Sequence, residues 1–85
     1  MRIWGNKMTL DEILPNIPEG KFLVVGSNDG KEFFVEGCKD GYESLFEARA
    51  FARARWIRPG NEQGENWTNY AVYDHQGKKV FTTGC

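Results

Sequence analysis

The sequence predicts an α+β domain: two β-hairpins form a four-stranded antiparallel sheet, one main α-helix packs across it, and a short helix lies near the N-terminus. Three observations predict this fold. A capped, alanine-rich helical pattern occupies the middle of the chain, a hairpin turn signal lies on each side of it, and a second capping motif lies near the N-terminus. We expect residues 1–85 to form one domain, because a chain of this length supports a single thin core.

The N-terminal part is expected to contribute a short helix. Thr9 and Glu12 form a T-x-x-E capping box, which predicts a helix over residues 10–14 that Pro15 ends. Residues 2–4 precede it as a candidate edge strand. The apolar residues expected to dock this segment on the domain are Leu10, Ile13, Leu14 and Ile17.

The first hairpin is predicted over residues 21–27 and 32–37, because Asp29-Gly30 is the signal of a two-residue type I′ turn. The resulting register pairs Gly26 with Phe33, Val24 with Val35 and Phe22 with Gly37. One face then carries Phe22, Val24, Phe33 and Val35, and the other carries Leu23, Val25 and Phe34. The second face is too apolar to remain in water, so either the N-terminal segment or a partner is expected to cover it.

The central helix is predicted over residues 44–58. Ser44 and Glu47 form an S-x-x-E capping box, and Pro59-Gly60 ends the pattern. Two opposite arcs of this helix compete as the core face. One carries Leu45, Ala48, Phe51, Ala52, Trp56 and Arg55, and the other carries Phe46, Ala50, Ala54 and Ile57 beside Arg49 and Arg53. We favour the first arc, because its small alanines let the helix lie close to the sheet and Arg55 can extend its charge to water.

The second hairpin follows a polar loop over residues 59–66, which we expect to be the most mobile part of the chain. Strands are predicted over residues 67–74 and 78–83. They are joined by a three-residue turn in which Gly77 adopts the left-handed conformation. In the predicted register Val72 and Val80 share one face, and Tyr73, Lys79 and Phe81 share the other.

Charge is distributed unevenly along a chain whose net charge is −1. The central helix carries four arginines against Glu47, a net charge of +3, whereas the remainder carries seven basic and eleven acidic residues, a net charge of −4. A basic helix on an acidic body indicates either complementarity to a partner or pairing of these arginines with acids of neighbouring strands.

No catalytic or metal-binding pattern occurs. His75 is the single histidine and lies in a predicted turn, no phosphate-binding glycine motif is present, and no Cys/His cluster has zinc spacing. Cys38 and Cys85 either form one bridge or remain free thiols. We therefore expect no enzymatic activity, no metal and no cofactor. The chain lacks an apolar run long enough for a membrane span, so we expect no membrane partner and a cytoplasmic location.

The main hypothesis is a protein-binding module that contacts another protein or a second copy of itself. Aromatic and arginine side chains are the types that interface anchors favour. The candidate partner-binding residues are Phe46, Arg49, Arg53 and Ile57 on the helix and Phe34, Tyr73 and Phe81 on the sheet. Short chains with this order of elements, rich in aromatic residues and near neutral, resemble the small accessory or inhibitor proteins that bacteriophages encode. The resemblance implies an accessory or inhibitory role.

The alternative hypothesis is a nucleic-acid-binding domain in which basic side chains line one groove and contact phosphates. The candidate residues are Arg49, Arg53, Arg58, Lys78 and Lys79. The isoelectric point near 5.8 argues against this alternative, since nucleic-acid-binding domains are usually basic.

Overall fold

A computed structural model describes Trp4, residues 7–58 and residues 68–83 of the chain. It has the predicted α+β fold, with a four-stranded antiparallel sheet, one main helix and a short N-terminal helix. In chain order the elements are α1 (Leu10–Ile13), the 3₁₀ turn η1 (Leu14–Asn16), β1 (Phe22–Ser27), β2 (Phe34–Glu36), α2 (Leu45–Trp56), β3 (Asn69–Asp74) and β4 (Lys79–Thr82). The expected strand at residues 2–4 and the expected mobile loop at residues 59–66 lie largely or wholly outside the described residues.

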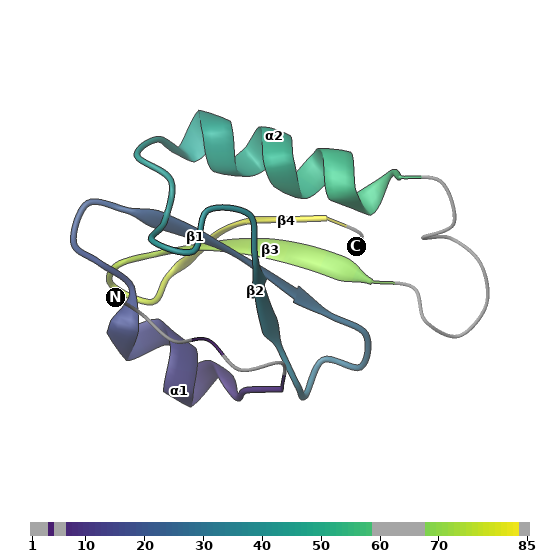
Figure 1. The fold of residues 1–85 in the computed structure, drawn as a ribbon, viewed down its shortest axis with the longest axis horizontal. Helices are drawn as coiled ribbons and strands as arrows, with labels where there is room; N and C mark the ends of the chain where they lie inside the picture. Colours follow the sequence, from purple (N-terminus) through teal and green to yellow (C-terminus); the bar gives the residue numbers. More distant parts are fainter. Residues whose placement is uncertain (1–3, 5–6, 59–67, 84–85) are drawn as a thin grey trace.

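The strand order is β2-β1-β3-β4, so the two hairpins join side by side through β1 and β3. These two central strands pair over their whole length, from Phe22 opposite Asp74 to Ser27 opposite Asn69. Figure 1 shows α2 lying over one face of the sheet and α1 lying against the other. The molecule therefore has three layers, and the sheet is covered on both faces.

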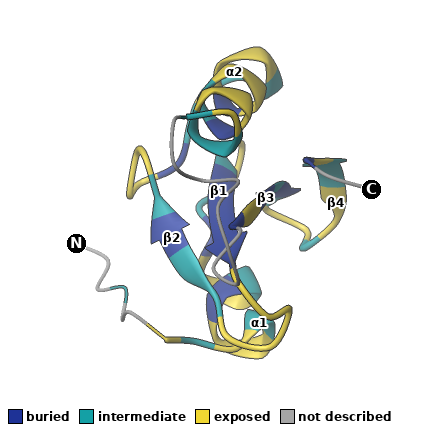
Figure 2. Ribbon diagram, turned by 90° about the vertical axis from the view of Figure 1, so that its right-hand side faces the viewer, coloured by how far each residue is buried: buried dark blue, intermediate teal, exposed yellow. Residues whose placement is uncertain are grey.

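Each face of the sheet has its own apolar core. On the α2 side the buried residues are Val24, Ala48, Ala52, Tyr70 and Val72. On the α1 side they are Ile13, Ile17, Leu23, Val25, Val35 and Tyr73, with Trp4 and Met8 packed against them. The N-terminal segment therefore covers the second apolar face, which was the first of the two predicted alternatives. Figure 2 shows β1 buried along most of its length between these layers.

The rotation of α2 about its axis is the predicted one. Ala48 and Ala52 are fully buried against the sheet, whereas Phe46 is 78% exposed and Ile57 is 64% exposed. The Ser44 hydroxyl accepts a hydrogen bond from the Glu47 backbone N–H at 3.1 Å, which confirms the predicted helix start. The helix start follows from local sequence, since capping involves near neighbours only, whereas the choice between the two arcs depends on packing against the sheet.

The predicted register of the first hairpin is wrong by one residue. Val25 lies opposite Val35 and Gly26 lies opposite Phe34. A type I′ turn requires positive φ at both central residues, and only Gly30 has it, at +77°. The Asp29 carboxylate instead accepts hydrogen bonds from the backbone N–H groups of residues 31 and 32, at 2.8 and 3.0 Å, which closes a longer loop. Because side chains alternate between the two faces of a sheet, this one-residue shift in register moves Phe34 to the α2 side.

The second hairpin has the predicted turn but a different register. Gly77 has φ +81°, as its left-handed position requires. Tyr73 lies opposite Lys79, and a bulge then places Val72 opposite Phe81 rather than Val80. The extra residue turns Phe81 toward α2, so the prediction that Phe81 shares a face with Tyr73 is wrong.

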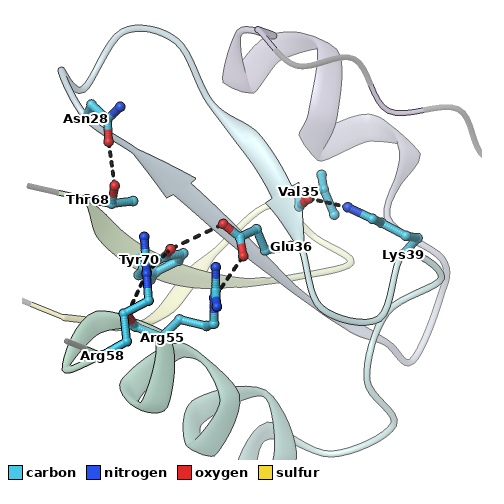
Figure 3. A network of polar contacts seen from close by, with 8 residues as sticks. All are labelled: Asn28, Val35, Glu36, Lys39, Arg55, Arg58, Thr68 and Tyr70. Carbon is cyan, nitrogen blue, oxygen red and sulfur yellow. Dashed lines mark hydrogen bonds and ion pairs between the residues drawn. The ribbon is translucent and has the colours of Figure 1, made fainter. Parts of the chain in front are cut away.

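The β2 edge of the sheet is capped by groups from elsewhere in the chain. Met8 and Phe33 exchange backbone hydrogen bonds of 2.9 and 2.8 Å, and the Lys39 ammonium donates to the Val35 carbonyl at 2.6 Å. Figure 3 shows this last contact. A lysine at a sheet edge hinders pairing with a further strand. None of the helices in the described residues has the length and apolarity that crossing a membrane requires.

Candidate functional site

The most distinctive surface is the outer side of α2, which we call the outer stripe: Phe46, Arg49, Ala50, Arg53 and Ile57. All five residues are exposed, and Phe46 and Ile57 are the exposed large apolar side chains among the described residues. Their offsets of three, four, seven and eleven positions from Phe46 align them along one side of the helix. The sequence predicted four of the five. Ala50 adds a small residue at the middle of the stripe.

Burial on the opposite side of the helix orients the outer stripe. Ala48 and Ala52 have no exposed surface and let α2 pack closely on β1 and β3. Leu45, Phe51 and Trp56 lie at the margins of the same core. The rest of the outer stripe therefore points away from the sheet, whereas Arg49 lies at the side of α2 that faces β4. Figure 2 shows the exposed outer side of α2 in yellow.

Two of the four helix arginines pair inside the molecule. The Arg55 Nε donates to the Glu36 carboxylate at 3.0 Å. The Arg58 Nη1 donates to the Tyr70 hydroxyl at 2.7 Å, and that hydroxyl donates to the second Glu36 oxygen at 3.2 Å. Figure 3 shows how this cluster ties the end of α2 to β2 and β3. Burial raises the pKa of Tyr70, the Arg58 hydrogen bond opposes the rise, and the Glu36 charge adds to it.

The other two arginines, Arg49 and Arg53, have no acidic partner among the described residues. The Arg49 guanidinium lies over the Phe81 ring, 5.4 Å from its centroid, which extends the stripe toward β4. Glu47 is close in sequence, but its backbone and carboxylate contact Ser44 at the start of the helix. The outer stripe therefore combines exposed apolar surface with two positive charges that have no acidic partner among the described residues.

A hollow of about 200 Å³ lies on the outer stripe, lined by Phe46, Arg49, Ala50 and Arg53. Ala50 has the smallest side chain of the four. A cavity of about 150 Å³ accommodates a benzene molecule. The hollow can therefore receive one large apolar side chain of a partner.

The second predicted patch, on the sheet, does not exist as one surface. Phe34 and Phe81 are half-buried on the α2 side, whereas Tyr73 is buried on the α1 side beneath the N-terminal segment. The prediction that these three residues share an exposed face is wrong, because the one-residue slip in β2 and the bulge in the second hairpin each reverse the direction of a side chain.

The basic residues of the nucleic-acid hypothesis are not gathered in one groove. Arg49 and Arg53 lie on the outer side of α2, and Arg58 contacts Tyr70. Lys79 lies opposite Tyr73, which places it on the other face of the sheet, and exposed Lys78 precedes it. The expectation of a continuous basic groove formed by these five residues is wrong.

A groove of about 440 Å³ on the α1 side was not predicted. Its lining includes Val25, Asp29, Asn69, Tyr73, Lys79 and Thr82. Several of its polar groups already serve the fold. The Ser27 hydroxyl donates to the Glu32 carbonyl at 2.8 Å, and the pKa of Asp29 is lowered chiefly by the backbone N–H groups of Glu32 and Lys31. No local pattern in the sequence signals this groove, since it depends on how far α1 extends over the sheet.

Among the described residues, the histidine and the cysteine lie outside the outer stripe. The His75 Nδ1 accepts a hydrogen bond from the Gly20 backbone N–H at 3.4 Å, which ties the second hairpin turn to the segment before β1. Cys38 is an exposed free thiol, and Cys85 lies outside the described residues. Within the described ranges no group of three acidic, histidine or cysteine side chains is arranged to hold a metal ion.

Comparison of this chain with protein-family models, with curated proteins and with solved structures finds no match. The function is therefore argued from the geometry of this molecule.

Proposed function

We propose that this protein is a non-enzymatic protein-binding module that contacts its partner through the outer stripe of α2. One observation carries the proposal. The described fold leaves two large apolar side chains in water, Phe46 in α2 and Ile57 at its C-cap. They lie along the same side as the two arginines that have no acidic partner among the described residues.

The proposal rests on the cost of exposing apolar surface without compensation. The other large apolar residues of the described chain are buried or half-buried. The N-terminal segment covers the second face of the sheet, which would otherwise be exposed to solvent. An exposed apolar patch beside charged residues is typical of a contact surface. Aromatic and arginine side chains are also the residue types that contribute most to binding free energy when a partner buries them.

The biological form of this function is a finer proposal. The resemblance to small accessory and inhibitor proteins of bacteriophages favours a protein that acts on its partner by occupying a surface, without chemistry of its own. A cytoplasmic location belongs to the same proposal. Fractionation of source cells and activity assays of the captured partner, with and without this protein, test these two points.

The test of the proposed function is a double substitution, Phe46→Ala with Arg53→Glu. Both side chains are exposed, so we expect a thermal melt close to that of the unaltered protein. Truncating a central anchor typically costs about 2 kcal/mol or more of binding free energy, and reversing an interfacial charge adds repulsion. In pull-downs from source cells followed by mass spectrometry, proteins retained by the unaltered chain should be lost from the variant.

Lys31→Glu is the matched control. It makes the same change of charge on an exposed residue of the β1–β2 loop, away from α2. We expect this variant to retain the captured proteins. A folded double variant that retains the same proteins as the unaltered chain overturns the proposal, and so does loss of those proteins from the control.

A further inference from the structure

We infer that the partner segment is an acidic amphipathic helix, which lies along the outer stripe with its carboxylates on Arg49 and Arg53 and one large apolar side chain in the hollow over Ala50. The inference rests on the proposed function and specifies the chemistry of the partner. Three observations support it: the shape of the stripe, the small residue at its middle, and the two charges without an acidic partner in the part of the chain that the structure describes.

The shape of the outer stripe fits a helix better than an extended peptide. From Phe46 to Ile57 the helix rises about 16 Å, or three turns, and the exposed apolar residues follow one narrow line. An extended peptide gains much of its affinity from main-chain hydrogen bonds to a sheet edge. The backbone groups within a helix are bonded internally, so the outer side of α2 offers no such partners.

The small residue at the middle of the stripe permits close approach. The hollow of about 200 Å³ is lined by Phe46, Arg49, Ala50 and Arg53. Packed helices interdigitate side chains of one helix with gaps on the other. A leucine or aromatic residue at the middle of the partner helix can fill this gap, while Phe46 and Ile57 contact the turns before and after it.

The charges select an acidic partner. Arg49 and Arg53 are four positions apart, so carboxylates three or four positions apart on a partner helix can meet both guanidinium groups. An entirely apolar partner would bury these charges without compensation, which is unfavourable. A second copy of the chain would bring its own Arg49 and Arg53 to the same surface, which adds repulsion.

Nucleic acid satisfies the arginines but not the rest of the stripe. Phosphates can meet the two guanidinium groups, yet Ile57 offers neither charge nor an aromatic face for a base to stack on. The other basic residues that could contact further phosphates of the nucleic-acid backbone lie elsewhere on the fold. An acidic helix uses every residue of the stripe, so it is the occupant that we propose.

The test is a selection from displayed random peptides of about 15 residues, a length that spans three turns with some excess. The intact protein is the bait, and the Phe46→Ala, Arg53→Glu variant is the counter-bait. We expect enriched peptides to carry acidic residues three or four positions apart beside apolar residues of helical spacing. They should bind roughly tenfold or more weakly to the variant, and their affinity should fall as salt is added.

The outcomes separate this inference from the proposed function. In one outcome, enriched peptides need Phe46 and Arg53 for binding and yet are basic, neutral or rich in residues of high β-strand propensity. That result overturns the acidic-helix inference but keeps the outer stripe as the binding surface. Peptides that bind both proteins equally, or the absence of any enrichment, overturn both.

A charge exchange completes the test. Replacing one acidic residue of an enriched peptide by lysine should weaken binding to the unaltered protein and strengthen binding to the Arg53→Glu variant. The Lys31→Glu protein should bind the original peptide more tightly than the exchanged peptide, as the unaltered protein does. If the exchanged peptide shows no preference for the Arg53→Glu variant at any of its acidic positions, the proposed pairing with Arg53 is wrong.

Discussion

Tyr70 shows how much of this small fold depends on single residues. Its ring is almost fully buried and meets Phe34 edge-to-face, with ring centroids 6.5 Å apart. Its hydroxyl contacts Glu36 and Arg58. One side chain on β3 thereby connects β2, the end of α2 and the core between them. Arg58 is consequently needed inside the molecule and is not available to a partner in the way that Arg49 and Arg53 are.

Gly26 makes this aromatic pair possible, which leads to a prediction at the same scale. A Cβ at this position would lie 2.8 Å from the Phe34 ring and 2.9 Å from the Tyr70 ring. Gly26→Ala should therefore lower the free energy of unfolding by roughly 1–3 kcal/mol, although alanine ordinarily suits a strand at least as well as glycine. Urea denaturation of the two proteins measures the difference.

A second substitution shows whether the rings cause this loss. The double variant Gly26→Ala, Phe34→Leu should lose less free energy of unfolding than the two single variants lose in sum. The reason is that the smaller side chain at position 34 leaves room for the new methyl group. If Gly26→Ala is as stable as the unaltered protein, the rings of Phe34 and Tyr70 move aside without loss of stability.

At the scale of elements, α2 offers a direct test of its orientation. Ala52 is fully buried and Ala54 is exposed, although they lie two positions apart in the same helix. Ala52→Leu should lower the free energy of unfolding by about 1–3 kcal/mol through overpacking. Ala54→Leu should change it by no more than about 0.5 kcal/mol. Both variants contain the same new side chain, so helix propensity cancels in the comparison of their denaturation midpoints.

The elements that the sequence predicts well are those governed by near neighbours. Ser44 and Glu47 lie within one turn, and their capping contact sets the start of α2. The alanines alternate between the two arcs of the helix, so packing on the sheet decides which arc is buried. The register of β2 depends instead on how the Asp29 carboxylate accepts backbone N–H groups within its loop. The dipeptide Asp29-Gly30 is compatible with either loop, so the sequence pattern alone does not distinguish them.

The same distinction applies to the candidate site. The exposure of Phe46 and Ile57 follows from the arc that we favoured as the core face, and it is confirmed. The division of the arginines does not follow from any local pattern, because Arg55 and Arg58 find Glu36 and Tyr70 on strands distant in sequence. Only the tertiary structure separates these two arginines from Arg49 and Arg53, which have no acidic partner among the described residues.

At the scale of the whole molecule, covering both faces of the sheet affects all three tyrosines in the sequence. Tyr70 lies in the α2-side core and Tyr73 in the α1-side core, and Tyr42 packs on Phe51 with ring centroids 5.9 Å apart. Burial is the largest cause that raises the pKa of each of them, because it disfavours the charged phenolate.

The raised values predict loss of stability at high pH. A tyrosine with a pKa higher in the folded than in the unfolded state stabilises the fold fully below the unfolded value of about 10, and this contribution is lost as pH rises through the folded value. Urea midpoints measured from about pH 8 to about pH 11 should therefore fall at the alkaline end.

Lysines titrate in the same range, so Tyr70→Phe and Tyr73→Phe serve as controls. Each variant should start from a lower urea midpoint at neutral pH and show a smaller decrease of that midpoint at alkaline pH. Phenolate absorbance should rise together with unfolding rather than before it. An equal alkaline decrease in the unaltered protein and both variants, or full phenolate absorbance in a protein that is still folded, would show that the tyrosines titrate freely and that the two cores do not exclude water as described.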